Sequence, residues 1–128
     1  MIGLGVDIVE IERIELAIKK NDKFLTRLFT EQEIEYIENK GSKNETVAGL
    51  FAGKEAVSKV LGTGISKFTW KDIEIDHTEE GQPFVLLHRG AKERGLAIGI
   101  NQVLLSIAHC KTYAIANAMG QHVEGLCI

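Results

Sequence analysis

The sequence predicts a protein of the α+β class, because helical and strand patterns occupy different parts of the chain. Apolar residues recur with helical spacing mainly between residues 11 and 61, whereas the alternation typical of strands dominates after residue 70. One further strand pattern precedes the helices. Such segregation favours α+β over an architecture in which strands and helices alternate.

The first predicted element is a strand over residues 2–9. Its side chains alternate between an apolar face and a face of glycines with one carboxylate: Ile2, Leu4, Val6 and Ile8 against Gly3, Gly5 and Asp7. A glycine inside a strand often marks the close approach of a ligand or of another backbone. Asp7 is therefore a candidate binding residue, or alternatively a cap of the following helix.

Three helical segments are predicted next. The first carries the stripe Ile11, Ile14 and Ile18 and breaks at Asn21-Asp22, before a second apolar set formed by Phe24, Leu25, Leu28 and Phe29. Thr30 and Glu33 have the spacing of a capping box, which predicts a helix start and an end near Gly41. After a polar loop, residues 46–61 form a long helix that Gly62-Thr63-Gly64 terminates.

The second half of the chain is predicted to consist mainly of strands. Residues 70–76 and 84–87 suggest a hairpin around turn residues 80–83. A short helix over residues 90–94 precedes two apolar strands, 103–108 and 113–119, which we expect to be buried. No repeat or linker divides the chain, so we expect a single domain over residues 1–128.

Composition narrows the class of function. The 128 residues carry a formal net charge of −3, which argues against a dedicated nucleic-acid-binding domain. No apolar stretch could span a bilayer, and the N-terminus has no signal-peptide pattern, so we expect no membrane association. Cys110 and Cys127 are too few for a disulfide framework. We expect a cytoplasmic protein.

The long helix holds the candidate catalytic residues. On a helical wheel its polar residues share one half: Lys54, Glu55, Ser58 and Lys59. Glu55 and Lys59 could form an ordinary surface ion pair at i, i+4. Together with Asp7 they could instead form a magnesium and polyphosphate site, because Mg²⁺ takes one or two carboxylates and completes its shell with phosphates and water.

Two further segments have open interpretations. Gly62-Thr63-Gly64 could bind a phosphate through backbone amides or could simply cap the helix. His109 could be a satisfied histidine at a strand end or a phosphate contact. Ser106 lies an odd number of residues away along the same strand and points to the other face, which argues against a serine hydrolase.

Basic residues recur along the early helices. Arg13, Lys20 and Arg27 are seven residues apart, with Lys19 and Lys23 between them. They would form one stripe if the helices were nearly collinear. The stripe is either a solvated face or a docking site for an acidic partner.

Four segments, in this order, closely resemble holo-acyl-carrier-protein synthases. They are GLGVDIVEIERI at residues 3–14, FAGKEAVSKVLGTGI at 51–65, WKDIEI at 70–75 and SIAH at 106–109. The resemblance implies the fold of the 4'-phosphopantetheinyl transferase superfamily, with helices packed on an antiparallel sheet. It also implies a homotrimer with active sites between neighbouring subunits.

The same resemblance implies the activity, which is the Mg²⁺-dependent transfer of the 4'-phosphopantetheine arm of coenzyme A to a serine of acyl carrier protein, in support of fatty acid biosynthesis. Asp7 and Glu55 would bind the metal, and Lys59 would contact the phosphate or pantetheine region. Further ligand contacts would come from Lys54, Ser58, Gly62, Thr63, Gly64 and His109. The acidic recognition helix of the carrier would dock on Arg13, Lys20, Lys23 and Arg27.

The sequence leaves open the base of the reaction, the effect of two departures from the family pattern and the choice between two rival functions. The proton of the attacking serine could pass to Glu55 or to a water on the metal. Gly53 stands where the family usually has alanine, and Ala108 stands where it commonly has Ser or Thr. A non-catalytic module that binds nucleotides or carrier proteins and a phosphohydrolase acting on coenzyme A are the two rival functions.

Overall fold

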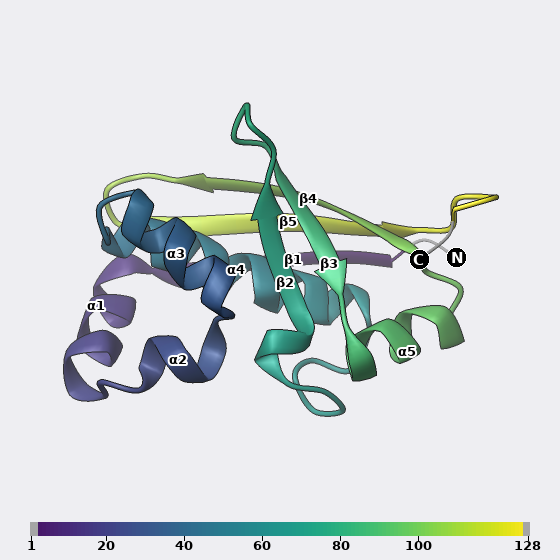
Figure 1. Ribbon diagram of the computed structural model, residues 1–128, viewed down its shortest axis with the longest axis horizontal. Helices are drawn as coiled ribbons and strands as arrows, with labels where there is room; N and C mark the ends of the chain where they lie inside the picture. Colours follow the sequence, from purple (N-terminus) through teal and green to yellow (C-terminus); the bar gives the residue numbers. More distant parts are fainter. Residues whose placement is uncertain (1–2, 127–128) are drawn as a thin grey trace.

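A computed structural model describes residues 3–126, and Figure 1 shows the arrangement of its helices and strands. The elements in chain order are β1 (Gly3–Glu10), α1 (Ile11–Lys20), α2 (Phe24–Leu28), α3 (Glu31–Asn39), α4 (Asn44–Val60), the 3₁₀ turn η1 (Trp70–Asp72), β2 (Ile73–His77), β3 (Pro83–Leu87), α5 (Arg89–Ala97), β4 (Gln102–His109) and β5 (Tyr113–Gln121). The α+β class is confirmed.

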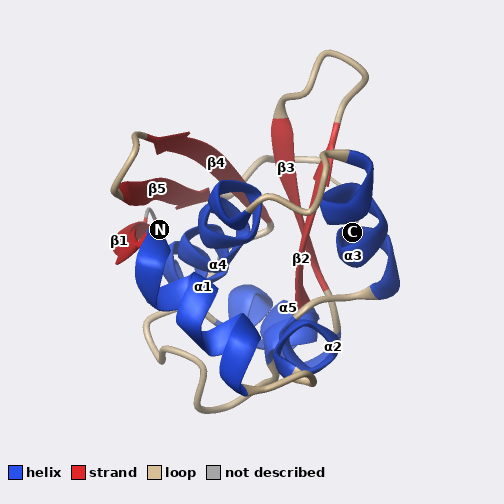
Figure 2. Ribbon diagram, turned by 90° about the vertical axis from the view of Figure 1, so that its left-hand side faces the viewer, coloured by secondary structure: helices blue, strands red, loops and turns tan. Residues whose placement is uncertain are grey.

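The strands form two antiparallel sheets. A three-stranded sheet has the order β1-β5-β4, and a two-stranded sheet pairs β2 with β3. Figure 2 shows the two sheets as separate units with the helices on one side of the larger one. The hairpin prediction is confirmed, but the strand expected from residue 70 begins only at Ile73, because Thr69 and Asp72 form a capping box that opens the η1 turn.

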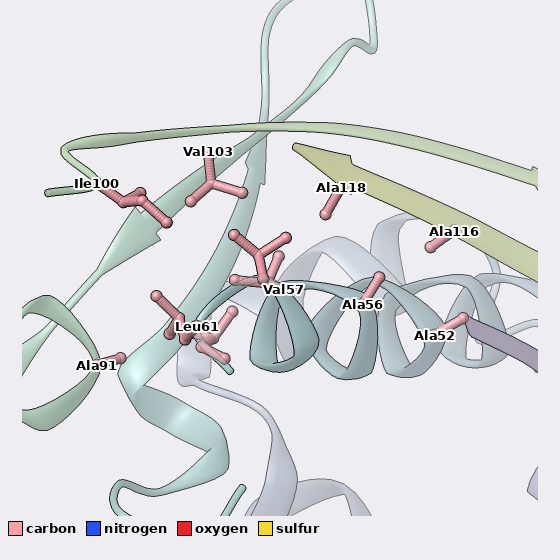
Figure 3. Close-up of a cluster of buried hydrophobic side chains, with 11 residues drawn as sticks. Ala52, Ala56, Val57, Leu61, Ala91, Ile100, Val103, Ala116 and Ala118 are labelled. Carbon is pink, nitrogen blue, oxygen red and sulfur yellow. The ribbon is translucent and has the colours of Figure 1, made fainter. Parts of the chain in front are cut away.

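Helix α4 packs along one face of the three-stranded sheet. Small side chains line this contact: Ala52 and Ala56 on α4, Ala116 and Ala118 on β5, all at most 4 % exposed. Figure 3 shows these alanines between the helix and the strand, with Val57 and Val103 filling the wider end. The small residues allow the helix to approach the sheet closely.

The glycines of β1 face this helix. A Cβ atom on Gly5 would lie 2.0 Å from the carbonyl oxygen of Ala56, and one on Gly3 would lie 2.9 Å from that of Val60. Of the two meanings considered for these glycines, the close approach of another backbone is the one observed. Asp7 lies on the same face, so it points towards α4.

The other face of the larger sheet is exposed. Leu4, Val6 and Ile8 are 75 %, 50 % and 61 % exposed, and Leu104 on β4 is 45 % exposed. The expectation that residues 103–108 and 113–119 form buried strands is therefore wrong for one of their two faces. Their alternation of exposed and covered residues is that of a sheet packed on one side.

Helices α1 to α3 form a second core with the N-terminal half of α4. Ile11, Ile14, Phe29 and Ile37 pack there against Val47 and Leu50. The predicted capping box is present: Glu33 N donates to Thr30 Oγ1, and Thr30 N donates to Glu33 Oε1. No helix within residues 3–126 has the length and apolar character needed to cross a membrane.

Candidate functional site

Asp7 of β1 and two residues of α4, Glu55 and Lys59, form the candidate active site. Asp7 and Glu55 line one cavity of about 370 Å³, at the edge where β1 meets α4. Lys59 Nζ donates to the Val6 carbonyl oxygen at 2.8 Å and lies 3.4 Å from Asp7 Oδ1. The residues at i and i+4 of α4 therefore meet the carboxylate of β1, as the sequence analysis required for a shared site.

The charges of Asp7 and Glu55 favour a cation in their shared cavity. Burial raises the pKa of Glu55, and the nearby carboxylate of Asp7 raises that pKa further, while Lys59 opposes both effects. A positive ion nearby would favour the ionised form of Glu55, which burial and the neighbouring negative charge disfavour.

The donor set fits magnesium. Within residues 3–126 no group of three or more His, Cys, Asp or Glu side chains could hold a metal by itself. A cation at Asp7 and Glu55 would thus depend on phosphate and water oxygens for its remaining ligands, which is the usual coordination of Mg²⁺ in proteins.

The Gly62-Thr63-Gly64 segment forms a tight turn directly after α4. Gly62 and Gly64 have φ values of +81° and +61°, a region that glycine adopts without steric cost. Gly62 N donates to the Lys59 carbonyl, and Ser66 Oγ donates to the Thr63 carbonyl. The turn caps the helix and keeps its backbone close to Lys59. This geometry is compatible with both interpretations of the glycines, which are capping of the helix and binding of a phosphate.

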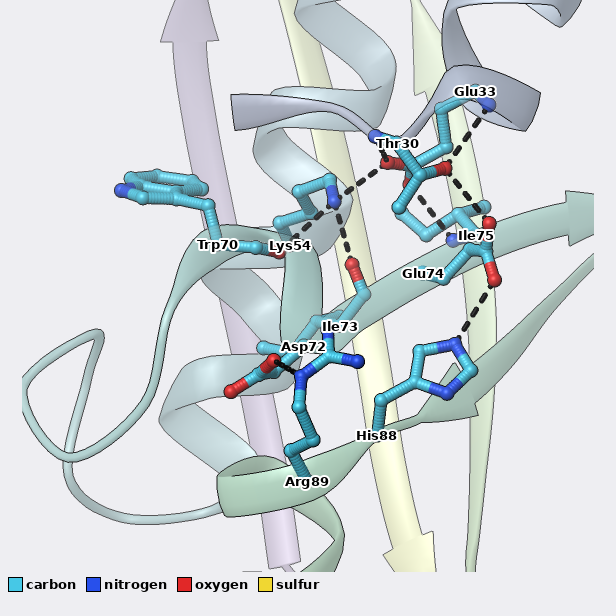
Figure 4. A network of polar contacts seen from close by, with 10 residues as sticks. All are labelled: Thr30, Glu33, Lys54, Trp70, Asp72, Ile73, Glu74, Ile75, His88 and Arg89. Atoms are coloured by element: carbon cyan, nitrogen blue, oxygen red, sulfur yellow. Dashed lines mark hydrogen bonds and ion pairs between the residues drawn. The ribbon is translucent and has the colours of Figure 1, made fainter. Parts of the chain in front are cut away.

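Lys54 does not belong to this site. Its side chain is 0 % exposed, and its ammonium contacts Glu33 Oε1 at 2.8 Å and the carbonyl oxygens of Trp70 and Ile73 at 3.0 and 2.5 Å (Figure 4). These three partners use the three donors of the ammonium, so Lys54 has none left for a ligand, and the prediction that it contacts one is wrong. Burial lowers the pKa of Lys54, and Glu33 raises it.

The network around Lys54 continues through Glu33 to one further acidic residue, Glu74. Glu33 Oε2 accepts a hydrogen bond from Ile75 N, and Thr30 Oγ1 donates to Glu74 at 2.7 Å. Glu74 also pairs with His88 Nε2 at 2.9 Å, as Figure 4 shows. This network ties α3 and α4 to β2 and to the end of β3.

Ser58 is also wrongly placed in the predicted ligand set. It is fully buried, and its hydroxyl donates to the Glu55 carbonyl at 2.6 Å. Lys54 and Ser58 share the polar half of the helical wheel with Glu55, but both are completely buried in the fold, and Lys54 contacts Glu33 of α3. A wheel drawn for a single helix contains no information on which neighbours cover it.

His109 lies away from the other candidates. It ends β4, the strand at the opposite edge of the sheet from β1, and lines a cavity of about 200 Å³ with Thr46 and Gly49 of α4. At 100° per residue, Thr46 is on the opposite side of the helix from Glu55. Within one chain, α4 therefore separates His109 from the Asp7–Glu55 pair.

The cavity beside His109 contains residues that the sequence analysis did not select. The imidazole of His77 stacks on Tyr36 with ring centroids 3.8 Å apart, and its Nδ1 atom is buried without a hydrogen-bond partner among the described residues. Glu45 completes the polar lining. These residues come from α3, α4 and β2, and no sequence spacing relates them.

The basic residues of α1 and α2 are exposed, as either interpretation of them requires. They do not form one straight stripe, because the chain turns at Asn21 and α2 runs in a different direction from α1 (Figure 1). Arg13 lines the same cavity as Asp7 and Glu55, together with Phe24 and Phe51. The basic surface therefore borders the candidate site.

The chain is similar in sequence to proteins of one family. The sequence model of the 4'-phosphopantetheinyl transferase superfamily matches residues 3–118. The chain is 55 % identical over 116 residues to a holo-[acyl-carrier-protein] synthase of Thermoanaerobacter sp., covering 91 % of this chain and 84 % of the relative. It is 52 % identical over 120 residues to one of Clostridium perfringens, covering 91 % and 90 %.

Solved structures of such synthases share the fold. A Helicobacter pylori holo-[acyl-carrier-protein] synthase in complex with coenzyme A superimposes with a TM-score of 0.81 at 35 % identity, covering 92 % of this chain and 99 % of that one. The Neisseria meningitidis protein gives a TM-score of 0.86 at 31 % identity, with coverage of 94 % and 99 %.

Proposed function

The chain belongs to the holo-[acyl-carrier-protein] synthase family of the 4'-phosphopantetheinyl transferase superfamily, and from this membership we propose its reaction and the residues that perform it. The protein transfers the 4'-phosphopantetheine group of coenzyme A to a serine of apo-acyl carrier protein. The products are holo-acyl carrier protein and adenosine 3',5'-bisphosphate. The observation that supports this most strongly is the meeting of Asp7, Glu55 and Lys59 within the matched region.

The cofactor is proposed to be Mg²⁺, held by Asp7 and Glu55. When bound, it supplies positive charge that offsets the negative charge developing on the pyrophosphate. The fit rests on the paired carboxylates and on the raised pKa of Glu55, which burial and Asp7 together cause. Among the described residues, Asp7 forms an ion pair with Lys59, whose Nζ atom lies 3.4 Å from Asp7 Oδ1.

Lys59 and Glu55 have separate roles in the proposed reaction. The serine oxygen forms a bond to the β-phosphorus of coenzyme A, and the bond from that phosphorus to the oxygen of the leaving 3',5'-ADP breaks. Lys59, whose side chain is half exposed beside Asp7, stabilises the charge on the departing phosphate. Glu55 is a candidate for accepting the serine proton, because a carboxylate with a raised pKa is a stronger base.

The active form is proposed to be a homotrimer. The exposed apolar face of β1 and β4 supports association, since monomeric proteins rarely expose a large contiguous apolar patch. The position of His109 supports it as well. A ligand that contacts both His109 and the Asp7–Glu55 pair can do so if the His109 cavity comes from a neighbouring subunit, because α4 separates the two within one chain.

The carrier protein is proposed to dock on Arg13, Lys20, Lys23 and Arg27 through the acidic recognition helix of the carrier. Arg13 connects this surface to the cavity of Asp7 and Glu55, which would place the carrier serine near the metal. Opposite charges on the two surfaces would accelerate encounter and select the partner. We place the reaction in the cytoplasm and in fatty acid biosynthesis.

A product assay separates this function from its rivals. The protein is incubated with coenzyme A and Mg²⁺, with and without apo-acyl carrier protein, and the nucleotide products are separated by chromatography. A transferase releases 3',5'-ADP only when the carrier is present. Release without carrier would indicate a phosphohydrolase, and binding of coenzyme A without any release would indicate a non-catalytic module.

A further inference from the structure

Helix α5 packs across the C-terminal end of α4. Leu61, the C-cap residue of α4, is completely buried, and so is Ala91 of α5 (Figure 3 shows the two together). A Cβ atom on Gly95 would lie 3.7 Å from Leu61 Cδ2. The two helices are therefore in direct contact at the point where α4 ends.

Arg94 of α5 binds the backbone at this junction. Its Nε atom donates a hydrogen bond of 2.8 Å to the carbonyl oxygen of Leu61. The last carbonyls of a helix have no partner within the helix, and the negative end of the helix dipole lies there. A guanidinium group satisfies both needs, because it is a donor and carries a permanent positive charge.

The same guanidinium also covers the start of the glycine turn. A Cβ atom on Gly62 would lie 3.4 Å from Arg94 Nη2, so this nitrogen lies beside Gly62. The other hydrogen bonds of the turn are local, such as Gly62 N to the Lys59 carbonyl and Thr63 Oγ1 to the Gly64 carbonyl. Arg94 thus links the turn to another element of the fold.

We propose that Arg94 is a positioning residue, which fixes the end of α4 and the Gly62–Gly64 turn in the conformation that binds coenzyme A. The inference rests on the proposed function, in which Lys59 and this turn contact the phosphate or pantetheine part of the substrate. Lys59 lies one helical turn before Gly62, so movement of the helix end would displace its ammonium as well. Arg94 acts through the backbone of this segment and not on the reacting atoms.

The test compares Arg94→Gln and Arg94→Lys with the parent enzyme in steady-state kinetics, varying coenzyme A and carrier protein separately. Lys92→Gln is the matched control, because it removes one positive charge from the same helix away from the turn. Arg94→Gln is expected to raise KM for coenzyme A about tenfold, because binding would then have to order the segment that Arg94 holds in the parent. The value of kcat should fall by a smaller factor, because the displaced Lys59 ammonium stabilises the departing phosphate less well, and KM for the carrier should not change.

Two further readouts identify a positioning role. Arg94→Lys keeps a donor and a charge, so it should recover part of the affinity for coenzyme A. Hydrogen exchange followed by mass spectrometry should show faster exchange in Arg94→Gln over residues 61–66 and unchanged exchange in the sheet. Unchanged KM for coenzyme A, or acceleration of exchange throughout the protein, would overturn the proposal.

The proposal can fail separately from the proposed function. If the parent protein shows no transfer at all, the proposed function fails. If the parent transfers normally and Arg94→Gln behaves like Lys92→Gln, only the role of Arg94 is refuted.

Discussion

Gly5 of β1 lies directly against the carbonyl of Ala56 on α4, so closely that a Cβ atom on Gly5 would come within 2.0 Å of that oxygen. The contact sets the distance between the strand and the helix. Asp7 is two residues further along β1, and Glu55 precedes Ala56. The pair of carboxylates is therefore held together by a contact that involves neither side chain.

Gly5→Ala is expected to destabilise the protein by about 3 kcal/mol or more, because the added methyl group meets backbone that cannot rotate away. Gly3→Ala should cost less, since its Cβ atom would lie 2.9 Å from the Val60 carbonyl. Urea unfolding followed by circular dichroism measures both. Equal stability of Gly5→Ala and the parent would show that β1 and α4 are not packed as described.

The buried ion pair of Lys54 and Glu33 makes a second prediction. Lys54→Met should lower the free energy of unfolding by about 3–5 kcal/mol, because it leaves the Glu33 carboxylate buried without its cation. The double variant Lys54→Met/Glu33→Gln removes the uncompensated charge and should recover part of this loss. If the double variant were as unstable as the sum of the two single variants, the two side chains would not be coupled.

His77 should make stability depend on pH. Its pKa is lowered below 6.5, chiefly by burial, with Asp76 acting in the opposite direction and Lys40 in the same one. The unfolded chain therefore binds a proton at His77 more readily than the folded chain does. The contribution of neutral His77 to the free energy of unfolding is intact above pH 6.5 and is lost as the pH falls through and below that value.

His77→Phe keeps a ring that can stack on Tyr36 but cannot be protonated. Between about pH 8 and about pH 5.5, the free energy of unfolding should fall more for the parent than for the variant. The midpoints of urea unfolding of both proteins at the two pH values measure this difference. A difference that does not vary with pH would show that His77 has the same pKa in both states.

The exposed face of the larger sheet predicts association of subunits. Ile8→Asp places a charge at a residue that is 61 % exposed in the single chain, so the fold should tolerate it, whereas an apolar interface should not. Light scattering after size exclusion is expected to give a trimer for the parent and a smaller species for the variant. Leu16→Asp, a charge on exposed α1, is the control; a trimer in Ile8→Asp would place the interface elsewhere.

Local patterns predicted the elements well. The Thr30–Glu33 capping box specifies the start of α3 with two reciprocal hydrogen bonds, which depend on neighbours in sequence alone. The i, i+4 relation of Glu55 and Lys59 likewise follows from helix geometry, and the glycine face of β1 indicated close approach of a second group. Which group approaches depends on tertiary packing, and in this fold it is the backbone of α4.

Gly53 shows why the packing of single residues was harder to predict. Propensity alone indicates that glycine weakens a helix by up to about 1 kcal/mol relative to alanine. In the fold, a Cβ atom at this position would lie 2.7 Å from Cδ1 of Ile75 on β2, so the missing methyl group provides room for a neighbouring strand. Lys54 and His77 are similar cases, because their partners lie on other elements.

The central claim, that this chain transfers phosphopantetheine with Asp7 and Glu55 holding the metal, is tested most directly by intact-mass spectrometry of the carrier protein. Apo-acyl carrier protein is mixed with coenzyme A, Mg²⁺ and the parent, Asp7→Asn or Glu55→Gln protein. We predict the mass gain of one phosphopantetheine group with the parent, its loss on chelation of the metal, and at least about a hundredfold slower gain with either variant. No mass gain with the parent, or unchanged rates and metal dependence in both variants, would contradict the account.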